Sequence, residues 1–430
     1  MDVIRKNLMD GIKLIAVSTD KFKTSLFSVS FLVPLCEGDA TANALLGDVL
    51  YRGSQCYPDI EALAAATDEL YGVSISPSVR QKGECQCISL IASMIDDRFT
   101  MDETPILEST IDLMGEILLH PAIERGVFRS DYVSGEGANL ADQIRAQVND
   151  KRGWSIHRLT ELMCQGEAYA LDKYGTAEEA ETMAPEVLWK QYQSLLRTAE
   201  VVFYYGGSAS LNQIETAIKK SFCSLLTARS TPRLECEVLA HPKWNETNIQ
   251  TDQMEVAQGK LALGFRTGGI DIHSPDYPAL LVFNSIYGGT ASSKLFLNVR
   301  EKLSLCYFAN SLIDKLKGIM IVSSGVEFDK FEVAREEILA QLRYIQSGEV
   351  TQEELQIGRQ AVASSLRTLL DSQGRLEDFW LTQTVANQED TPEQLMKRVQ
   401  AVSCEQVISV AKRMELDTIY YLTGEKAEVG

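Results

Sequence analysis

The stretch 286–308 reads Ile-Tyr-Gly-Gly-Thr-Ala-Ser-Ser-Lys-Leu-Phe-Leu-Asn-Val-Arg-Glu-Lys-Leu-Ser-Leu-Cys-Tyr-Phe, and the rest of the chain can be interpreted around it. Gly288 and Gly289 interrupt an apolar helical pattern. Ser292 and Ser293 are residue types that cap a new helix. The stretch therefore predicts a helix, a glycine break and a second helix in close succession.

The second of these helices is predicted over 293–303 and carries a polar residue near its end. Arg300 lies there, and Tyr307 begins an apolar, strand-like run seven residues later. The pattern predicts a helix followed by a strand, with Arg300 and Tyr307 as candidate binding residues. A surface arginine and a half-buried tyrosine would give the same pattern. The apolar positions that give the helix a buried side are Leu295, Phe296 and Val299.

The same order of elements occurs earlier in the chain. Tyr51 and Tyr287 are 287 − 51 = 236 positions apart, and Gly53 precedes Gly289 by the same number. Tyr71 precedes Tyr307 by 236 as well. Because several landmarks keep one register over this distance, the chain is predicted to contain an internal duplication.

Each copy contains predicted strands and predicted helices, which is typical of an α+β fold. We expect two homologous lobes, each a mostly antiparallel sheet covered by helices on one face and joined to the other by a linker. The expected boundaries are 1–226 for the N-terminal lobe, 227–248 for the linker and 249–430 for the C-terminal lobe. Strands are predicted at 12–17, 25–33, 85–92, 201–207, 260–265, 307–312, 319–322 and 418–424, and helices at 40–51, 59–70, 185–195, 208–226, 274–287, 331–347 and 405–414, with a capping box at 351–354 opening one more helix.

Composition excludes several classes of function. The net charge of −19 argues against nucleic acid, which needs clustered lysine and arginine, and against an anionic membrane surface. The first residues contain no apolar signal core, and no segment has the run of apolar residues that a membrane helix needs. Nine scattered cysteines fit a reducing compartment. We therefore expect a cytoplasmic protein without nucleic-acid or membrane partners.

Few residues are spaced as metal ligands. Cys85 and Cys87 share one strand face, but no second pair of cysteines accompanies them. His157, Glu161 and Cys164 share a helix face, which is one possible three-ligand cluster, although such a face is usually incidental. The sequence gives no strong metal site.

The stretch 286–308 resembles the pitrilysin/insulinase family of zinc metallopeptidases, in its processing-peptidase-like subgroup. Members carry a segment of the type G-G-x-x-S-S-x-L-F-x-x-x-R-E-K-x-x-L-x-Y before a strand. The resemblance implies that Arg300 and Tyr307 hold the backbone and carboxylate side of a bound peptide. It extends over nearly the whole chain and implies two α+β lobes joined by a linker.

Active members of that family carry HxxEH on the first helix of the first lobe, where two histidines bind zinc and the glutamate is the general base. The matching positions here are Ala44, Gly47 and Asp48, so both histidines and the base are absent. A further glutamate ligand is expected downstream, where Asp142 or Gln143 stands. The resemblance therefore implies a member without catalytic residues or a metal of its own.

Three functions remain open. The first is a non-catalytic, peptide-binding subunit of a heterodimeric zinc peptidase, whose partner is a homologous HxxEH-bearing chain that holds the zinc. The second is a non-enzymatic scaffold or assembly protein of the same fold. The third is an enzyme with an unrecognised site, which the missing general base disfavours. We expect the first, and no catalysis by this chain alone.

Overall fold

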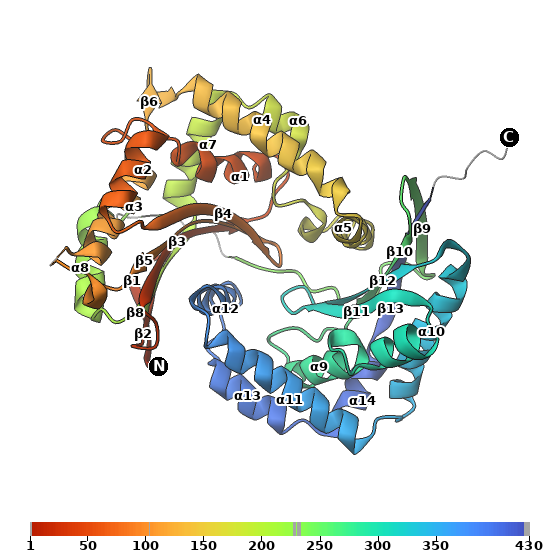
Figure 1. Cartoon of the computed structure of the whole chain (residues 1–430). Coiled ribbons are helices and arrows are strands. Elements are labelled where there is room, and N and C mark those ends of the chain that lie inside the picture. Colours follow the sequence, from red (N-terminus) through yellow and green to blue (C-terminus); the bar gives the residue numbers. More distant parts are fainter. Residues whose placement is uncertain (1, 103, 227–228, 230–233, 425–430) are drawn as a thin grey trace. The chain divides into compact units, whose positions relative to one another are not determined.

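The computed structural model describes residues 2–102, 104–226, 229 and 234–424. These residues form two compact units, and each unit is built on one mixed sheet (Figure 1). Unit 1 contains the described residues of 1–145, 171–235 and 372–385, and unit 2 contains those of 146–170, 236–371 and 386–430.

The sheet of unit 1 has six strands in the order β1-β2-β8-β3-β5-β4. All neighbours are antiparallel except β2 and β8, which are parallel. The mostly antiparallel sheet predicted from sequence is confirmed. The strands are β1 (Asp2–Met9), β2 (Ile12–Ser18), β3 (Thr24–Pro34), β4 (Ser74–Lys82), β5 (Cys85–Ile95) and β8 (Glu200–Gly207), and a separate pair is formed by β6 (Ile123–Glu124) and β7 (Val127–Phe128).

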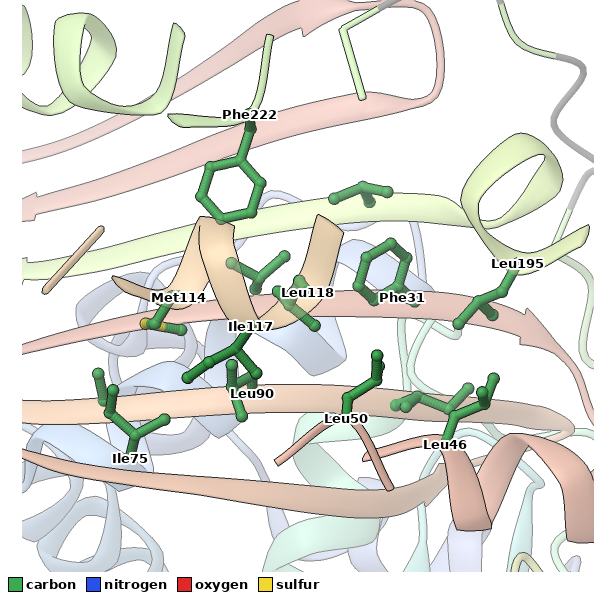
Figure 2. Close-up of a cluster of buried hydrophobic side chains, with 14 of the residues drawn as sticks. Phe31, Leu46, Leu50, Ile75, Leu90, Met114, Ile117, Leu118, Leu195 and Phe222 are labelled. Atoms are coloured by element: carbon green, nitrogen blue, oxygen red, sulfur yellow. The ribbon is translucent and has the colours of Figure 1, made fainter. Parts of the chain in front are cut away.

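The core of unit 1 lies between this sheet and its helices. Side chains alternate between the two faces of a strand, and Phe27, Val29 and Phe31 of β3 all enter the core. Figure 2 shows Phe31 and Leu90 of the sheet among helical side chains such as Leu46. The helices are α1 (Ala40–Leu50), α2 (Ile60–Glu69), η1 (Asp97–Phe99), α3 (Ile106–Leu119), α4 (Ser130–Ala146), α6 (Ala177–Glu181), α7 (Pro185–Thr198) and α8 (Leu211–Ser221).

The sheet of unit 2 has five strands in the order β11-β12-β10-β13-β9, and only β13 and β9 are parallel. The strands are β9 (Asn248–Met254), β10 (Gly259–Arg266), β11 (Cys306–Asp314), β12 (Ile319–Val326) and β13 (Glu415–Gly424). The helices are α9 (Tyr277–Asn284), η4 (Ser285–Gly289), η5 (Leu295–Lys302), η6 (Phe328–Lys330), α10 (Phe331–Gln346), α11 (Gln352–Leu369), α13 (Pro392–Gln400) and α14 (Cys404–Lys412), with η2 (Gln147–Asn149), α5 (Lys151–Met163) and η3 (Ala168–Ala170) from earlier in the chain.

The two sheets have the same topology, as the duplication predicts. The order β2-β8-β3-β5-β4 in unit 1 corresponds strand by strand to β9-β13-β10-β12-β11 in unit 2. The parallel pair occupies the same place in both. The first residues of β2 and β9, Ile12 and Asn248, are 248 − 12 = 236 positions apart, the spacing already found in the sequence.

One helix from each half of the sequence packs on the sheet of the other half. Helix α12 (Gln373–Val385) belongs to unit 1, where Ser28 of β3 donates a hydrogen bond to Glu377 at 3.0 Å. Ser28 lies on the face opposite the core, so α12 covers the second face. In unit 2, α5 covers the second face in the same way, because Leu159 and Met163 pack with Ala262 of β10.

Each lobe expected from sequence was one continuous segment of the chain, whereas each compact unit combines several segments. Segments 146–170 and 372–385 are exchanged because their helices find apolar or hydrogen-bonding partners on the other half's sheet. Each sheet therefore has helices on both faces rather than on one. Part of the predicted linker 227–248, namely 227–228 and 230–233, lies outside the described residues, and 234–247 contain no helix or strand.

Local signals in the sequence placed several helix ends correctly. Asp59 accepts a hydrogen bond from the Ala62 amide at the start of α2. Thr351 and Glu354 form the reciprocal capping box that opens α11. Among the described residues, no helix combines the length and the apolarity that a membrane crossing requires.

Candidate functional site

Helix α1 holds the positions that would carry the zinc motif. Ten of its eleven residues are buried, and Asp48 is the exception. Ala44 is 1% exposed and belongs to the apolar core of unit 1. The side chain of Ala44 has no atom that can bind a metal and is packed in the core. We therefore assign α1 a structural role.

Gly47, which stands where the general base would be, lies directly against strand β4. A Cβ atom added at Gly47 would come within 2.9 Å of the Cβ of Pro77, closer than side chains approach in proteins. A glutamate would therefore require β4 or α1 to move. The position has lost both the carboxylate and the space for it.

Asp48 is the one carboxylate on α1 and has a perturbed acidity. Burial, and then the negative charge of Glu136 on α4, raise the pKa of Asp48 to about 6. Arg52 binds Glu136 at 3.0 Å. Asp48 is therefore a carboxyl group that binds a proton beside the ion pair of Arg52 and Glu136, and it does not belong to a group of metal ligands.

The carboxylate of α4 that acts on Asp48 is Glu136, whereas the sequence places the missing ligand position at Asp142 or Gln143. Asp142 is exposed and lies 3.8 Å from Arg145, and Gln143 is also exposed. These two residues lie about two turns further along α4 than Glu136. The electrostatic effect of Glu136 on Asp48 identifies the turn of α4 that faces α1.

A buried polar network next to α1 was not anticipated. Asn43 donates to Gln86 of β5 at 3.0 Å and accepts from Gln191 of α7 at 2.9 Å. Gln86 in turn donates to the carbonyl groups of Ala40 and Lys173. The network ties α1 to the sheet with amides, and isolated Asn and Gln residues in the sequence gave no signal for it.

The zinc ion of active family members does not fit the residues found here. In the described part of the chain, no three histidine, cysteine, aspartate or glutamate side chains are grouped to hold a metal. His157 lies 3.2 Å from Glu161, but Arg158 also binds Glu161, at 2.8 Å. Burial raises the pKa of Cys164 to about 12, which disfavours the thiolate that binds metals.

The other cysteine and histidine candidates are structural in their surroundings. The sulfur atoms of Cys85 and Cys87 lie 4.0 Å apart inside β5, where both residues are buried. Helix α3 ends at His120, whose backbone amide donates a hydrogen bond to the carbonyl oxygen of Glu116.

The second candidate region, around the Gly288-Gly289 break, has unusual helical geometry. Both η4, which contains Gly288 and Gly289, and η5 are π-helical, and the break between them lies at 290–293, directly after the two glycines. The α-helix predicted over 293–303 is thus helical but more loosely wound. The hydroxyl of Ser293 accepts a long hydrogen bond of 3.4 Å from the amide of Phe296, three residues further on, which is the geometry of a helix cap. Short π-helical segments are frequent at functional sites.

Arg300 lies on η5 with its guanidinium partly exposed. Its charge is 4.5 Å from the ring centre of Phe296, and its Nε is 3.5 Å from a carboxylate oxygen of Glu301. The side chain is 40% exposed, so these contacts leave it accessible. Burial is the main cause of the raised pKa of Cys306, and the charge of Arg300 opposes it, so Arg300 is electrostatically close to the start of β11.

Tyr307 lies in β11, which is an edge strand of the unit 2 sheet. The pairing of β11 with β12 shifts between Cys306 and Phe308, so Tyr307 occupies a bulge. Its side chain is 70% exposed. No described residue forms a hydrogen bond with its hydroxyl, and bulges on sheet edges often redirect a side chain toward a ligand.

The two sequence-predicted regions thus differ in what they offer. The α1 region offers packed apolar groups and one proton-binding carboxyl. The β11 region offers an accessible guanidinium, an accessible phenol and a free strand edge.

Comparisons with known proteins find inactive peptidase domains among the proteins similar to this chain. Residues 182–362 match the family described as "Peptidase M16 inactive domain". The chain is 34% identical over 419 residues, 97% of each protein, to a Bacillus subtilis (strain 168) protein named "Probable inactive metalloprotease YmfF". It also resembles, over 41% of its length at 25% identity, an uncharacterized zinc protease YmxG of the same organism, of which it covers 43%.

Solved structures show the same fold. A conserved protein from Enterococcus faecalis V583 superposes with a TM-score of 0.90 at 28% identity, and both chains are covered completely. A peptidase M16 inactive domain from Pseudomonas fluorescens gives a TM-score of 0.80 at 19% identity, also over both full chains.

The fold and the sites define a two-unit peptidase-type chain whose zinc-motif helix has no ligand histidines. The chain belongs to the M16 peptidase family, the pitrilysin/insulinase family predicted from its sequence.

Proposed function

We propose that this chain is the non-catalytic, peptide-binding subunit of a two-chain M16 zinc metallopeptidase. The zinc and the general base would be supplied by a homologous partner that carries HxxEH. Arg300 and Tyr307 would hold the peptide. The observation that carries the proposal is the exposed, unpaired Tyr307 on a strand edge near an exposed Arg300.

The chemistry of the two side chains suits a peptide ligand. An arginine is always charged, and its planar donors can bind a carbonyl or carboxylate oxygen through two hydrogen bonds. A phenol hydroxyl can donate one more hydrogen bond to the same strand of peptide. An unpaired edge strand can add an extended peptide through its backbone groups. All three features lie within η5 and β11.

Inactivity of the chain by itself is expected from its own residues, and its Bacillus subtilis relative is named a probable inactive metalloprotease. Gly47 cannot accept a proton, and a glutamate at this position would collide with Pro77. Without a base and a zinc-bound water, peptide hydrolysis has no attacking group. Arg300 and Tyr307 could then take part in peptide hydrolysis only if another chain supplies the zinc and the general base.

The proposal is tested by the binding of a fluorescein-labelled, unstructured peptide to the purified chain, measured by fluorescence anisotropy. Arg300→Ala should weaken binding roughly 10- to 100-fold, the usual effect of losing hydrogen bonds to a charged group. Arg367→Ala is the matched control, since this exposed arginine lies on α11 in the same unit. Equal binding by both variants would favour a scaffold role instead.

A further inference from the structure

The equivalent edges of the two sheets differ by one strand. In unit 1, β1 pairs with β2 along its whole length, from Asp2 opposite Ser18 to Met9 opposite Ile12, and the strands are antiparallel. In unit 2, the equivalent of β2 is β9, and β9 ends the sheet. No strand among the described residues covers the outer side of β9.

The residues that would form the missing strand are held elsewhere. With the spacing of 236, residues 2–9 correspond to 238–245, because 2 + 236 = 238 and 9 + 236 = 245. Val238 lies beside Gly318, at the turn between β11 and β12. Lys243 binds Glu167 at 3.1 Å. The segment thus crosses the end of the sheet, from the turn between β11 and β12 to the start of β13, where His241 lies 2.7 Å from Glu415, instead of pairing along β9. Pro242 also has no amide hydrogen for strand pairing.

The outer side of β9 is accessible and lacks the features that usually protect a sheet edge. Ile249 is 52% exposed, and Gln250, Thr251 and Gln253 are exposed as well, so neither face of the strand is fully covered. Trp244, which precedes the strand, is 50% exposed. The strand itself contains no lysine or proline, which are the residues that commonly block edge-to-edge pairing.

The residues of the segment that contains β9 carry only negative charge, although Lys151 of α5 lies 3.9 Å from Met254 at the end of the strand. From Trp244 to Gly259 the sequence contains Glu246, Asp252 and Glu255 and no lysine or arginine. Asp252 is partly neutralised by Arg158, at 3.4 Å. Glu246 and Glu255 are exposed and form no ion pair with a described residue. In unit 1, the strand at this place carries Arg5 and Lys6 in its middle.

We propose that the outer edge of β9 binds an extended strand of a partner protein, in the place that β1 occupies in unit 1. The bound strand runs antiparallel to β9 and carries basic side chains. This docking edge lies on the opposite side of the unit 2 sheet from β11, so it is separate from the peptide site proposed above.

The test uses a fluorescein-labelled peptide with the sequence of residues 2–9, because this is the strand that fits the equivalent edge. Its anisotropy is measured with the full chain and with the double variant Ile249→Lys/Thr251→Lys. Both residues are exposed, so the variant should fold, which thermal unfolding checks. Val187→Lys, an exposed site on α7, is the control.

The expected result is saturable binding to the wild type and to Val187→Lys, weakened at least tenfold in the double variant. A peptide in which the arginine and lysine are both replaced by glutamate should bind less. Binding that is unaffected by the double variant would overturn the proposal. The same holds for absent binding, or for binding that requires removal of residues 425–430, since the edge would then be covered by the chain itself.

Discussion

Gly47 and Pro77 are packed so closely that a single added carbon at Gly47 would lie 2.9 Å from the Cβ of Pro77. The position that would hold the general base in an active relative is thus closed by a strand of the same unit. Loss of the zinc motif is accompanied by packing that fills its place, and a simple exchange of side chains would not reverse it.

Substitution of Gly47 tests this packing. Gly47→Ala should lower the free energy of unfolding by about 1–3 kcal/mol, the usual cost of overpacking a core. Gly374→Ala is the matched control, because a Cβ at this helical glycine meets no atom within 4 Å, and its effect should be neutral or slightly stabilising. Thermal unfolding of both variants measures the difference. Equal stability of the two variants would show that β4 moves at little energetic cost to accommodate the added carbon.

Restoring the whole motif should also fail. The triple variant Ala44→His/Gly47→Glu/Asp48→His would place two imidazoles and a carboxylate in a packed helix. We expect no stoichiometric zinc after dialysis and a lower unfolding temperature, measured by metal analysis and calorimetry. Wild type dialysed in parallel is the control. One bound zinc per chain would contradict the account of α1.

Asp48 should make stability depend on pH. Because the pKa of Asp48 in the folded chain is about 6, above its ordinary value of 3.8, the folded state keeps a proton that the unfolded state has lost. Stability contributed by this group is therefore present at low pH and decreases as pH rises from about 4 to about 6. Asp48→Asn should gain stability relative to wild type over this range. Unfolding temperatures measured across it, with Asp142→Asn as an exposed control on α4, give the result.

Glu167 should be essential for the position of α5. This carboxylate accepts from Arg266 at 2.8 Å and Lys317 at 2.6 Å, and all three side chains are buried. Although burial opposes its ionisation, these hydrogen bonds hold the pKa of Glu167 at about 2. Glu167→Gln removes the carboxylate that Arg266 and Lys317 share, although Arg266 keeps Asp417 at 2.9 Å, and breaking a buried pair typically costs about 3–5 kcal/mol. Hydrogen exchange should show faster opening of α5, while the exposed Glu186→Gln on α7 should leave it unchanged.

Tyr307 should affect substrate binding through its hydroxyl alone. In the complex with an HxxEH-bearing partner, Tyr307→Phe should raise KM roughly fivefold, the effect of about 1 kcal/mol, with kcat retained. Tyr344→Phe, at another exposed tyrosine of unit 2, is the control. Steady-state peptide cleavage measures both parameters. A fall in kcat alone would assign the hydroxyl to the transition state instead.

Much of the fold could be predicted because it depends on local signals. Asp59 and Thr351 begin helices through their own caps, and the 236-residue spacing reappears in the order of the strands. The exchange of α5 and α12 could not be predicted, because it depends on contacts such as Ser28 with Glu377, 349 positions apart.

The candidate site was predictable to a similar degree. Ala44, Gly47 and Asp48 were located by counting from a turn, and the structure places them on one buried helix. The roles of Arg300 and Tyr307 remain predictions, although both residues are accessible. The effect of Glu136 on Asp48 depends on how α1 and α4 pack and was not predicted, and the π-helical winding of η5 has no known sequence signal.

The most direct test is a native co-purification of the tagged chain, followed by assays for zinc and for chelator-sensitive cleavage of an unstructured peptide. Wild type and Arg300→Ala are compared, with Arg367→Ala as the control. The proposal predicts that an HxxEH-bearing chain and zinc co-elute and that cleavage falls only in Arg300→Ala. A chain that elutes alone, without metal and without cleavage, would contradict it.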